Sequence, residues 1–132
     1  MIVVLDASAG IEIALGRSKS KDFEEYLVGA SKVITSDLYK AETANVIGKY
    51  VKANLLEKEK SIQIYQYCKE IIDEYVDISE NVEEAINESI RLKHPTYDLL
   101  YLSLARRNGA VLLSLDKKLN EIAQKNGIEI AK

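Results

Sequence analysis

Residues 2–6 read Ile-Val-Val-Leu-Asp, and residues 111–116 read Val-Leu-Leu-Ser-Leu-Asp. Each stretch is a short, mostly apolar run that ends on an aspartate. Runs of this kind, rich in branched side chains, are typical of strands that are buried on both faces of a sheet. Because such strands occur mainly in parallel sheets covered by helices on each side, the two stretches favour an α/β fold.

The rest of the chain also alternates between short apolar runs and longer helical patterns. We expect strands at 2–5, 32–35, 75–78, 111–115 and 128–130. We expect helices at 7–17, 21–28, 36–54, 57–72, 79 or 81 to 92, 97–108 and 117–125. Strands that are separated by helices pair in parallel through right-handed crossovers. The pattern therefore predicts a three-layer α/β/α fold with a mainly parallel central sheet, formed by residues 1–132 as one domain.

The composition excludes several classes of function. The 132 residues include one cysteine, Cys68, so the chain has no intramolecular disulfide or multi-cysteine zinc site and suits a reducing cytoplasm. Cys68 is expected in the core, and the only histidine, His94, in a loop before Pro95. The net charge of -3 leaves only a local basic patch to bind nucleic acid. Neither a membrane span nor a secretion signal is expected.

Two carboxylates stand where predicted strands end. Asp6 follows the first apolar run and Asp116 follows the last one. In a parallel sheet the carboxyl ends of neighbouring strands border the same crevice, where ligands bind. The ordinary alternative is that each aspartate caps the helix that follows it.

Two further carboxylates fall among apolar residues of predicted helices. Glu42 follows Tyr39 by three residues and shares its side of the helix at 36–54 with an apolar stripe. That stripe is predicted to comprise Tyr39, Val46, Tyr50 and Val51. Asp98 lies near the start of the most apolar helix of the chain. The alternatives are that Glu42 reaches water at the edge of the stripe and that Asp98 only complements the helix dipole.

Considered together, the four carboxylates point to one site. Glu42 and Asp98 can reach the crevice of Asp6 and Asp116 from helices packed on the sheet. Carboxylates gathered in one pocket repel one another, and their pKa values rise unless a cation is present. Ligand sets made only of oxygen select hard cations such as Mg²⁺ or Mn²⁺. Such a cation activates water and offsets charge on a phosphate, so the chemistry implied is metal-assisted hydrolysis of a phosphodiester.

The order and spacing of these segments resemble those of PIN domains, and specifically of the small VapC-type toxins of toxin–antitoxin systems. The resemblance rests on residues 4–8, 39–46, 97–105 and 112–119 and covers nearly the whole chain. It implies a Mg²⁺- or Mn²⁺-dependent endoribonuclease that is selective for RNA sequence or structure. It also implies a homodimer and a cognate antitoxin that inserts a segment over the active site.

The resemblance also implies roles for single residues. The acidic quartet would be Asp6, Glu42, Asp98 and Asp116. Asp6 and Asp98 would be the most direct metal ligands, and Asp116 would bind directly or through water. Glu42 would hold the attacking water or help to deprotonate it, and Ser8 and Ser114 would orient carboxylates. Local candidates for phosphate contact are Lys19, Lys21, Arg91, Lys93, Arg106, Arg107, Lys117 and Lys118, most of them expected to be ordinary solvated residues.

Several other functions place acids at strand ends. A two-component receiver needs an acidic pair after its first strand and a lysine after its last, and a haloacid-dehalogenase phosphatase needs Asp-x-Asp. The run Asp6-Ala7-Ser8 lacks the second acid, and no phosphate-binding Gly-x-x-x-x-Gly-Lys loop is present. A PIN nuclease of RNA processing and a non-catalytic binding module on the same fold remain as alternatives.

Overall fold

The fold is built on one sheet of four parallel strands in the order β3-β2-β1-β4. The structure is a computed structural model, and it describes residues 1–132. The strands are β1 (Ile2–Leu5), β2 (Lys32–Ser36), β3 (Glu74–Val76) and β4 (Val111–Leu113). The helices are α1 (Ala7–Ala14), α2 (Ser20–Gly29), α3 (Leu38–Lys52), α4 (Ser61–Glu70), α5 (Val82–Leu92), α6 (Thr96–Asn108) and α7 (Lys117–Lys125), with 3-10 turns at Lys58–Lys60 and Ile78–Glu80.

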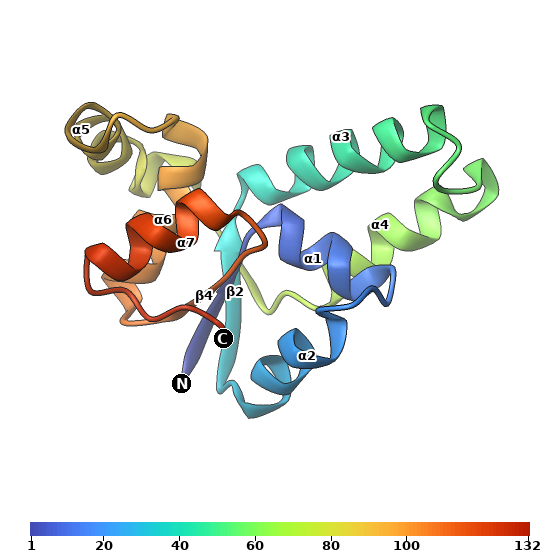
Figure 1. Ribbon diagram of the computed structural model, residues 1–132, viewed down its shortest axis with the longest axis horizontal. Helices are drawn as coiled ribbons and strands as arrows, with labels where there is room; N and C mark the ends of the chain where they lie inside the picture. Colours follow the sequence, from blue (N-terminus) through green and yellow to red (C-terminus); the bar gives the residue numbers. More distant parts are fainter.

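Helices cover both faces of the sheet, as the sequence predicts for a three-layer α/β/α fold. Figure 1 shows α1, α2 and α4 on one side of the strands and α5, α6 and α7 on the other. Helix α1 packs against α2, α3 and α4, and α6 packs against α5, α7 and the strands. Both faces of the central strands are therefore dry, and Val3, Val4 and Leu5 of β1 have no exposed surface. None of the helices combines the length and apolarity that crossing a bilayer requires.

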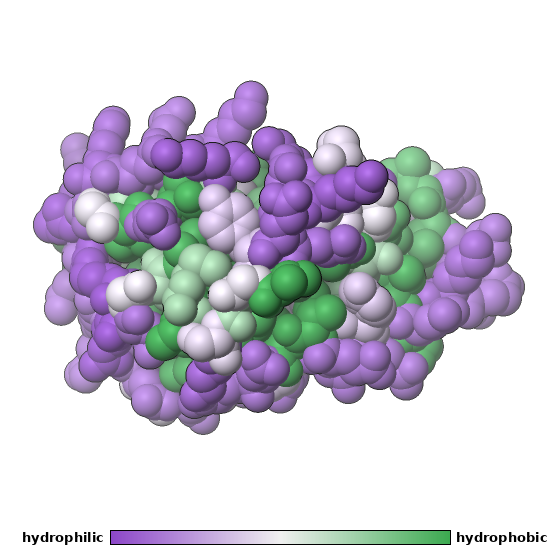
Figure 2. Space-filling view, turned by 90° about the horizontal axis from the view of Figure 1, so that it is seen from below, coloured by the Kyte–Doolittle hydropathy of each residue, from purple (hydrophilic) through white to green (hydrophobic).

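The strand order creates a crevice beside β1. From β1 the chain crosses to β2 and then to β3, and it later returns to β4 on the opposite side of β1. This reversal is the switch point at which α/β sheets bind ligands, outside the carboxyl ends of the strands. The end of the molecule away from this crevice is seen in Figure 2, where hydrophilic side chains surround a smaller apolar area.

Some predicted strands are shorter than expected. The strand at 111–115 ends at Leu113, because Ser114 turns its hydroxyl toward Asp6 and accepts the backbone N–H of Asp116 at 3.0 Å. The strand at 75–78 covers Glu74–Val76. The prediction of a strand at 128–130 is wrong, because this segment forms only a single parallel bridge, between Ile130 and Leu112. The sheet therefore has four strands, not five.

The apolar stripe of α3 was predicted correctly only in part, because Val46 and Tyr50 pack at the edge of the core and not in it. The fully buried face carries Tyr39, Thr43 and Ile47, whereas Val46 and Tyr50 are only partly covered. The buried face was not recognised in the sequence because Thr43 is polar. Its hydroxyl can be buried because it donates to the Tyr39 carbonyl at 2.7 Å.

Small residues let α1 pack closely behind the crevice. A Cβ atom at Gly10 would lie 2.2 Å from the Tyr39 hydroxyl, so no other residue fits there without displacing Tyr39. That hydroxyl donates to the carbonyl of Cys68 at 2.6 Å. The buried Cys68, as predicted, belongs to the core. These contacts fix the start of α1, which carries part of the site.

Candidate active site

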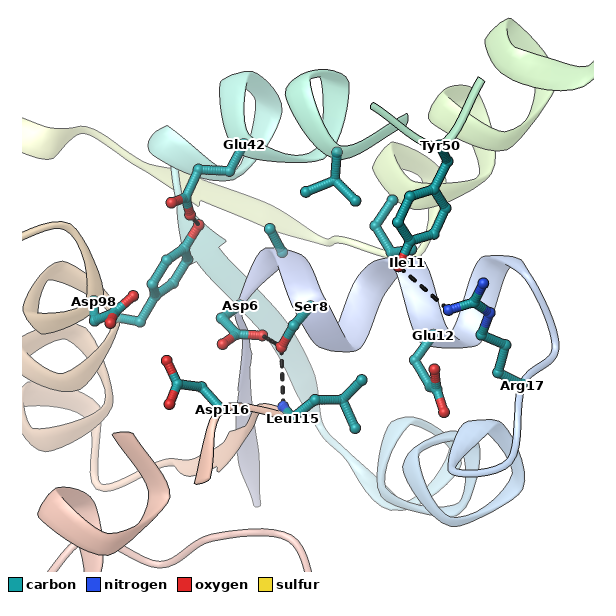
Figure 3. Close-up of a pocket in the computed structure, with 13 residues that line it drawn as sticks. Asp6, Ser8, Ile11, Glu12, Arg17, Glu42, Tyr50, Asp98, Leu115 and Asp116 are labelled. Carbon is teal, nitrogen blue, oxygen red and sulfur yellow. Dashed lines mark hydrogen bonds between the residues drawn. The ribbon is translucent and has the colours of Figure 1, made fainter. Parts of the chain in front are cut away.

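A pocket of about 310 Å³ opens at the carboxyl ends of β1 and β4. All four carboxylates singled out by the sequence line it, namely Asp6, Glu42, Asp98 and Asp116. Figure 3 shows that they reach it from four elements of the fold, with Asp6 after β1, Glu42 on α3, Asp98 on α6 and Asp116 before α7. The structure therefore arranges all four side chains around one pocket.

Asp6 is the most buried of the four and has an exposed fraction of 6%. It caps α1, because its Oδ1 atom accepts the N–H of Ala9 at 3.0 Å and the Ser8 hydroxyl at 2.6 Å. Its Oδ2 atom accepts the hydroxyl of Ser114. Burial raises the pKa of Asp6 to about 6, although these hydrogen bonds lower it, and the charge of Asp98 raises it further. The capping alternative is thus true of Asp6, but it accounts for only part of the environment.

Asp116 also has two functions in the structure. Its Oδ1 atom caps α7 by accepting the N–H groups of Lys118 at 3.0 Å and Leu119 at 3.1 Å. Its side chain still faces the pocket, where Figure 3 places it beside Asp6. Ser8 ties the two strand ends together, since its oxygen also accepts the N–H of Leu115 at 2.9 Å. Asp6 and Asp116, which follow β1 and β4, are therefore held in fixed positions relative to each other.

Glu42 is held by a tyrosine that lies far away in the sequence. The hydroxyl of Tyr101 donates to Glu42 Oε1 at 2.5 Å, and Tyr101 itself is 1% exposed. Burial raises the pKa of Glu42, the hydrogen bond from Tyr101 lowers it, and the nearby Asp98 raises it again. The structure shows that the ring of Tyr101 is in the core and its hydroxyl reaches the pocket.

Asp98 has a neighbour that the sequence interpretation missed. His94 lies in the loop before Pro95, as expected, but it is buried there, and its Nε2 atom lies 2.7 Å from Asp98 Oδ2. The other ring nitrogen, Nδ1, is buried without a partner. A proton there would be an unsatisfied donor, so we assign the proton to Nε2, which donates to Asp98. The four-residue spacing of His94 and Asp98 was the signal available in the sequence.

Two other residues of the pocket were not predicted. Glu12, on α1, is buried and accepts the backbone N–H of Lys19 at 2.9 Å. Arg17, just beyond α1, is the only basic side chain that lines the pocket. Of the predicted phosphate contacts, Arg91 and Arg106 are instead paired with glutamates of α5. None of the eight predicted basic residues lines the pocket.

The donor set of the pocket fits a hard divalent cation. Four carboxylates line it, and no lysine or arginine forms a salt bridge with any of them. Ligand atoms of Asp98 and Asp116 lie within 4.8 Å of each other and of the His94 ring, so these two carboxylates are close enough to share one ion. Asp6 and Glu42 lie outside that group. Carboxylate oxygens are the ligands that Mg²⁺ and Mn²⁺ prefer.

Known structures share this fold. The protein PAE2754 from Pyrobaculum aerophilum superposes with a TM-score of 0.76 at 17% identity, over 99% of this chain and 84% of that one. VapBC2 from Rickettsia felis, bound to a DNA fragment from its promoter, gives 0.69 at 18% identity over 98% and 97%. VapBC-1 from nontypeable Haemophilus influenzae gives 0.65 at 19% identity over 98% and 96%.

Sequence comparison leads to the same group of proteins. The chain is 28% identical over 128 residues to Ribonuclease VapC3 of Pyrobaculum aerophilum, which covers 92% of this chain and 94% of the relative. Residues 3–125 match the sequence pattern of the PIN domain. Because that match spans nearly the whole chain, and the fold and the pocket agree with it, this protein belongs to the PIN domain family.

Proposed function

We propose that this protein is a divalent-metal-dependent endoribonuclease and the toxin of a toxin–antitoxin pair. The observation that carries the proposal is the set of four carboxylates in one pocket that no basic side chain neutralises. The sequence similarity to Ribonuclease VapC3 supports RNA as the substrate. The structural similarity to VapBC2 and VapBC-1 supports the fold. The pairing of two components in the VapBC proteins suggests that this chain also has a protein partner.

Each side chain has a defined part in the proposed mechanism. A bound Mg²⁺ or Mn²⁺ would neutralise charge on the phosphate and lower the pKa of a bound water. Asp6, Asp98 and Asp116 would hold the cation, with Asp6 kept in place by Ser8 and Ser114. Glu42 would orient the attacking water and accept its proton.

Two neighbouring side chains, Tyr101 and His94, would position carboxylates of this site. Tyr101 donates to one oxygen of Glu42 and leaves the other free for the water. His94 donates to one oxygen of Asp98 and leaves the other for the cation. Each neighbour would thereby orient its carboxylate toward the ion.

The proposal extends to the assembly of the protein. Large apolar side chains remain exposed on the surface, among them Ile62 at 67%, Ile90 at 72% and Tyr97 at 65%. We propose that a second copy of the chain and a cognate antitoxin cover such surfaces. The buried, unpaired Cys68 agrees with a cytoplasmic location. Light scattering of the isolated chain tests the homodimer, and co-purification with the product of an adjacent small gene tests the antitoxin.

The test of the nuclease is cleavage of a mixed RNA pool in Mn²⁺, in Mg²⁺ or in EDTA, with the parent chain compared with Asp98→Asn. Metal-dependent cuts that disappear in the variant support the proposal, and their positions begin to define the substrate. Equal activity in both proteins contradicts the assignment of the site. RNA binding without cleavage, unchanged by the substitution, favours a binding module on the same fold.

A further inference from the structure

The pocket has a second end that differs in chemistry from the carboxylates. Figure 3 shows Arg17 and Tyr50 together at one end and Glu42, Asp98 and Asp116 at the other. Apolar side chains line the space between the two ends, among them Ile11 and the partly exposed Leu115. A ligand that fills the pocket therefore meets an acidic end, an apolar wall and one guanidinium, with the carboxylate of Glu12 beside that guanidinium.

The position of Arg17 is fixed by the way α1 ends. The N–H of Gly16 donates to the Ile13 carbonyl at 3.1 Å, and the N–H of Arg17 donates to the Glu12 carbonyl at 3.1 Å. This hydrogen-bond pair closes a helix end of the Schellman type, which needs a left-handed residue. Gly16 supplies it with a φ of 63°. The turn brings the Arg17 backbone back beside the pocket instead of along the helix axis.

The side chain of Arg17 is held by an aromatic ring and not by a carboxylate. Its guanidinium carbon lies 4.9 Å from the centre of the Tyr50 ring, and Nη1 donates to the Tyr50 hydroxyl at 3.2 Å. Five carboxylates line the same pocket, yet Arg17 forms a salt bridge with none of them. Glu12, the acid nearest in sequence, accepts the N–H of Lys19 instead. Most of the five N–H donors of Arg17 are therefore free for an anion.

The chemistry of that anion follows from the opposite end of the pocket. If one phosphate of an RNA strand lies among the carboxylates, the neighbouring nucleotide extends along the apolar wall and presents its own phosphate. A planar guanidinium binds phosphate oxygens through paired N–H groups. A duplex would keep its bases stacked away from Ile11 and Leu115, whereas an unpaired strand can lay a base or ribose against them.

We propose that Arg17, held in place by Tyr50, binds the phosphate next to the scissile one in single-stranded RNA. The inference rests on the proposed nuclease function and adds to it the position of a neighbouring nucleotide. Arg17 would contact the substrate but not the reacting atoms. It would contribute to binding and to the choice of strand, and the carboxylates would carry the hydrolysis.

The experiment uses an RNA oligonucleotide that the parent protein cuts, together with a series in which one flanking phosphate at a time is replaced by an uncharged methylphosphonate. The parent is compared with Arg17→Gln and with Lys52→Gln. Lys52 is a matched control, because it is an exposed cation in the last turn of α3 that does not line the pocket. Steady-state KM and kcat are measured in Mn²⁺ at several salt concentrations.

The parent and Lys52→Gln are expected to show the same loss of activity when one flanking phosphate is replaced. Each should lose about tenfold in kcat/KM when one particular flanking phosphate is neutralised. Arg17→Gln should have a KM about tenfold higher on the unmodified RNA and should be indifferent to that methylphosphonate. Its kcat should stay within about twofold of the parent, and the slope of log kcat/KM against log salt should fall by about 0.7. Tyr50→Phe, which keeps the ring, should lie between the two.

Two results would overturn the inference. One is a methylphosphonate penalty that is as large in Arg17→Gln as in the parent, with the same salt slope. The other is a loss of cleavage in Arg17→Gln that no single phosphate accounts for, which would mean that Arg17 is structural or contacts a protein partner. In both cases the parent still cuts RNA and the proposed function stands. A parent that cuts no RNA in any metal contradicts the proposed function itself, and the inference falls with it.

Discussion

Helix α6 has a cluster of charged side chains at each end, and the two clusters are built in opposite ways. At its C-terminal end Arg106 donates to Glu84 at 3.1 Å and to Glu88 at 2.7 Å, and Arg91 also pairs with Glu88. At its N-terminal end Asp98 contacts a histidine and shares a pocket with three other carboxylates, none of which forms a salt bridge with a lysine or arginine. The first cluster is neutralised by the protein, and the second is not.

The pKa values of the two clusters differ in the same sense. Burial opposes ionisation of Glu88, but the hydrogen bonds and charges of Arg106 and Arg91 outweigh it, so the pKa of Glu88 is lowered. At the other end burial raises the pKa of Asp6 to about 6 and also raises that of Glu42. The protein thus pairs the glutamates at the C-terminal end of α6 with its own arginines. The carboxylates at the N-terminal end have no such partner, so we expect a cation from solution to bind there.

The largest effect is expected from removing one charge at the unmatched end. Asp98→Asn keeps the shape of the side chain and an acceptor for His94, so the fold should persist. We expect cleavage to fall by about 10³-fold or more, because a lost ligand removes several kcal/mol of charge stabilisation. The matched change at the neutralised end, Glu84→Gln, should leave cleavage within about twofold. Single-turnover cleavage rates measure both effects. Equal losses of rate in Asp98→Asn and Glu84→Gln would contradict the claim that only the carboxylates at the N-terminal end of α6 take part in cleavage.

A large change in stability is expected from Asp6. Its pKa is raised from 3.8 to about 6 in the folded protein, so its ionisation opposes folding. The stabilisation that the protonated carboxyl provides is complete below about pH 4 and is lost as the pH rises through about 6. Asp6→Asn keeps an N-cap side chain and should stabilise the metal-free protein by up to about 3 kcal/mol at pH 7.

Urea unfolding in EDTA at several pH values measures this effect. The difference between Asp6→Asn and the parent should shrink as the pH is lowered toward 4. The same variant should cut no RNA, so it would be more stable and inactive. A variant that is less stable than the parent at pH 7 would show that the hydrogen bonds of Ser8 and Ser114 outweigh the cost of the buried charge.

Substitutions of Tyr101 and His94, which hydrogen-bond to carboxylates of the site, should have intermediate effects on cleavage. Tyr101→Phe removes the hydroxyl that donates to Glu42, and His94→Ala removes the imidazole beside Asp98. Each should lower kcat by about 10- to 100-fold, as is usual for groups that orient ligands. Loss of the Tyr101 hydrogen bond should also raise the pKa of Glu42, so the acid limb of the pH–rate profile should move to higher pH. An unshifted profile in Tyr101→Phe would argue against Glu42 as the proton acceptor.

The smallest effect on activity is expected at the neutralised end. Arg106→Gln leaves Glu84 and Glu88 without their shared partner, which should cost about 1 kcal/mol of stability because both glutamates are only half-buried. Cleavage per folded molecule should stay within about twofold of the parent. Thermal unfolding and a cleavage assay on the same sample separate the two quantities. A large loss of kcat in the folded variant would mean that α6 couples its two ends.

The strand ends of the site could be predicted from sequence because local pattern determines them. Apolar runs that end in Asp6 and Asp116 indicate buried strands, and parallel topology brings their carboxyl ends together. Asp98 and Glu42 stood out as acids among apolar residues. Whether the four residues act as the sequence resemblance implies stays a prediction for the experiments above.

What was missed depends on contacts that sequence pattern does not reveal. Tyr101 and Glu42 are 59 residues apart, and nothing local signals their hydrogen bond. Pro95 correctly indicated a loop around His94, but the sequence did not reveal that the imidazole is buried and faces Asp98. Arg17 was expected at the end of a helix, and the turn at Gly16 brings it back to the pocket.

The most direct test of the account is a calorimetric titration of the metal-free protein with Mn²⁺. The parent and Glu84→Gln should bind the ion with the same affinity and show the same rise in melting temperature, because the neutralised cluster offers no site. Asp98→Asn should bind it at least about tenfold more weakly. Mn²⁺ binding that survives Asp98→Asn unchanged, or a parent chain that binds no Mn²⁺ at all, would contradict the claim that the unmatched carboxylates form a cation site.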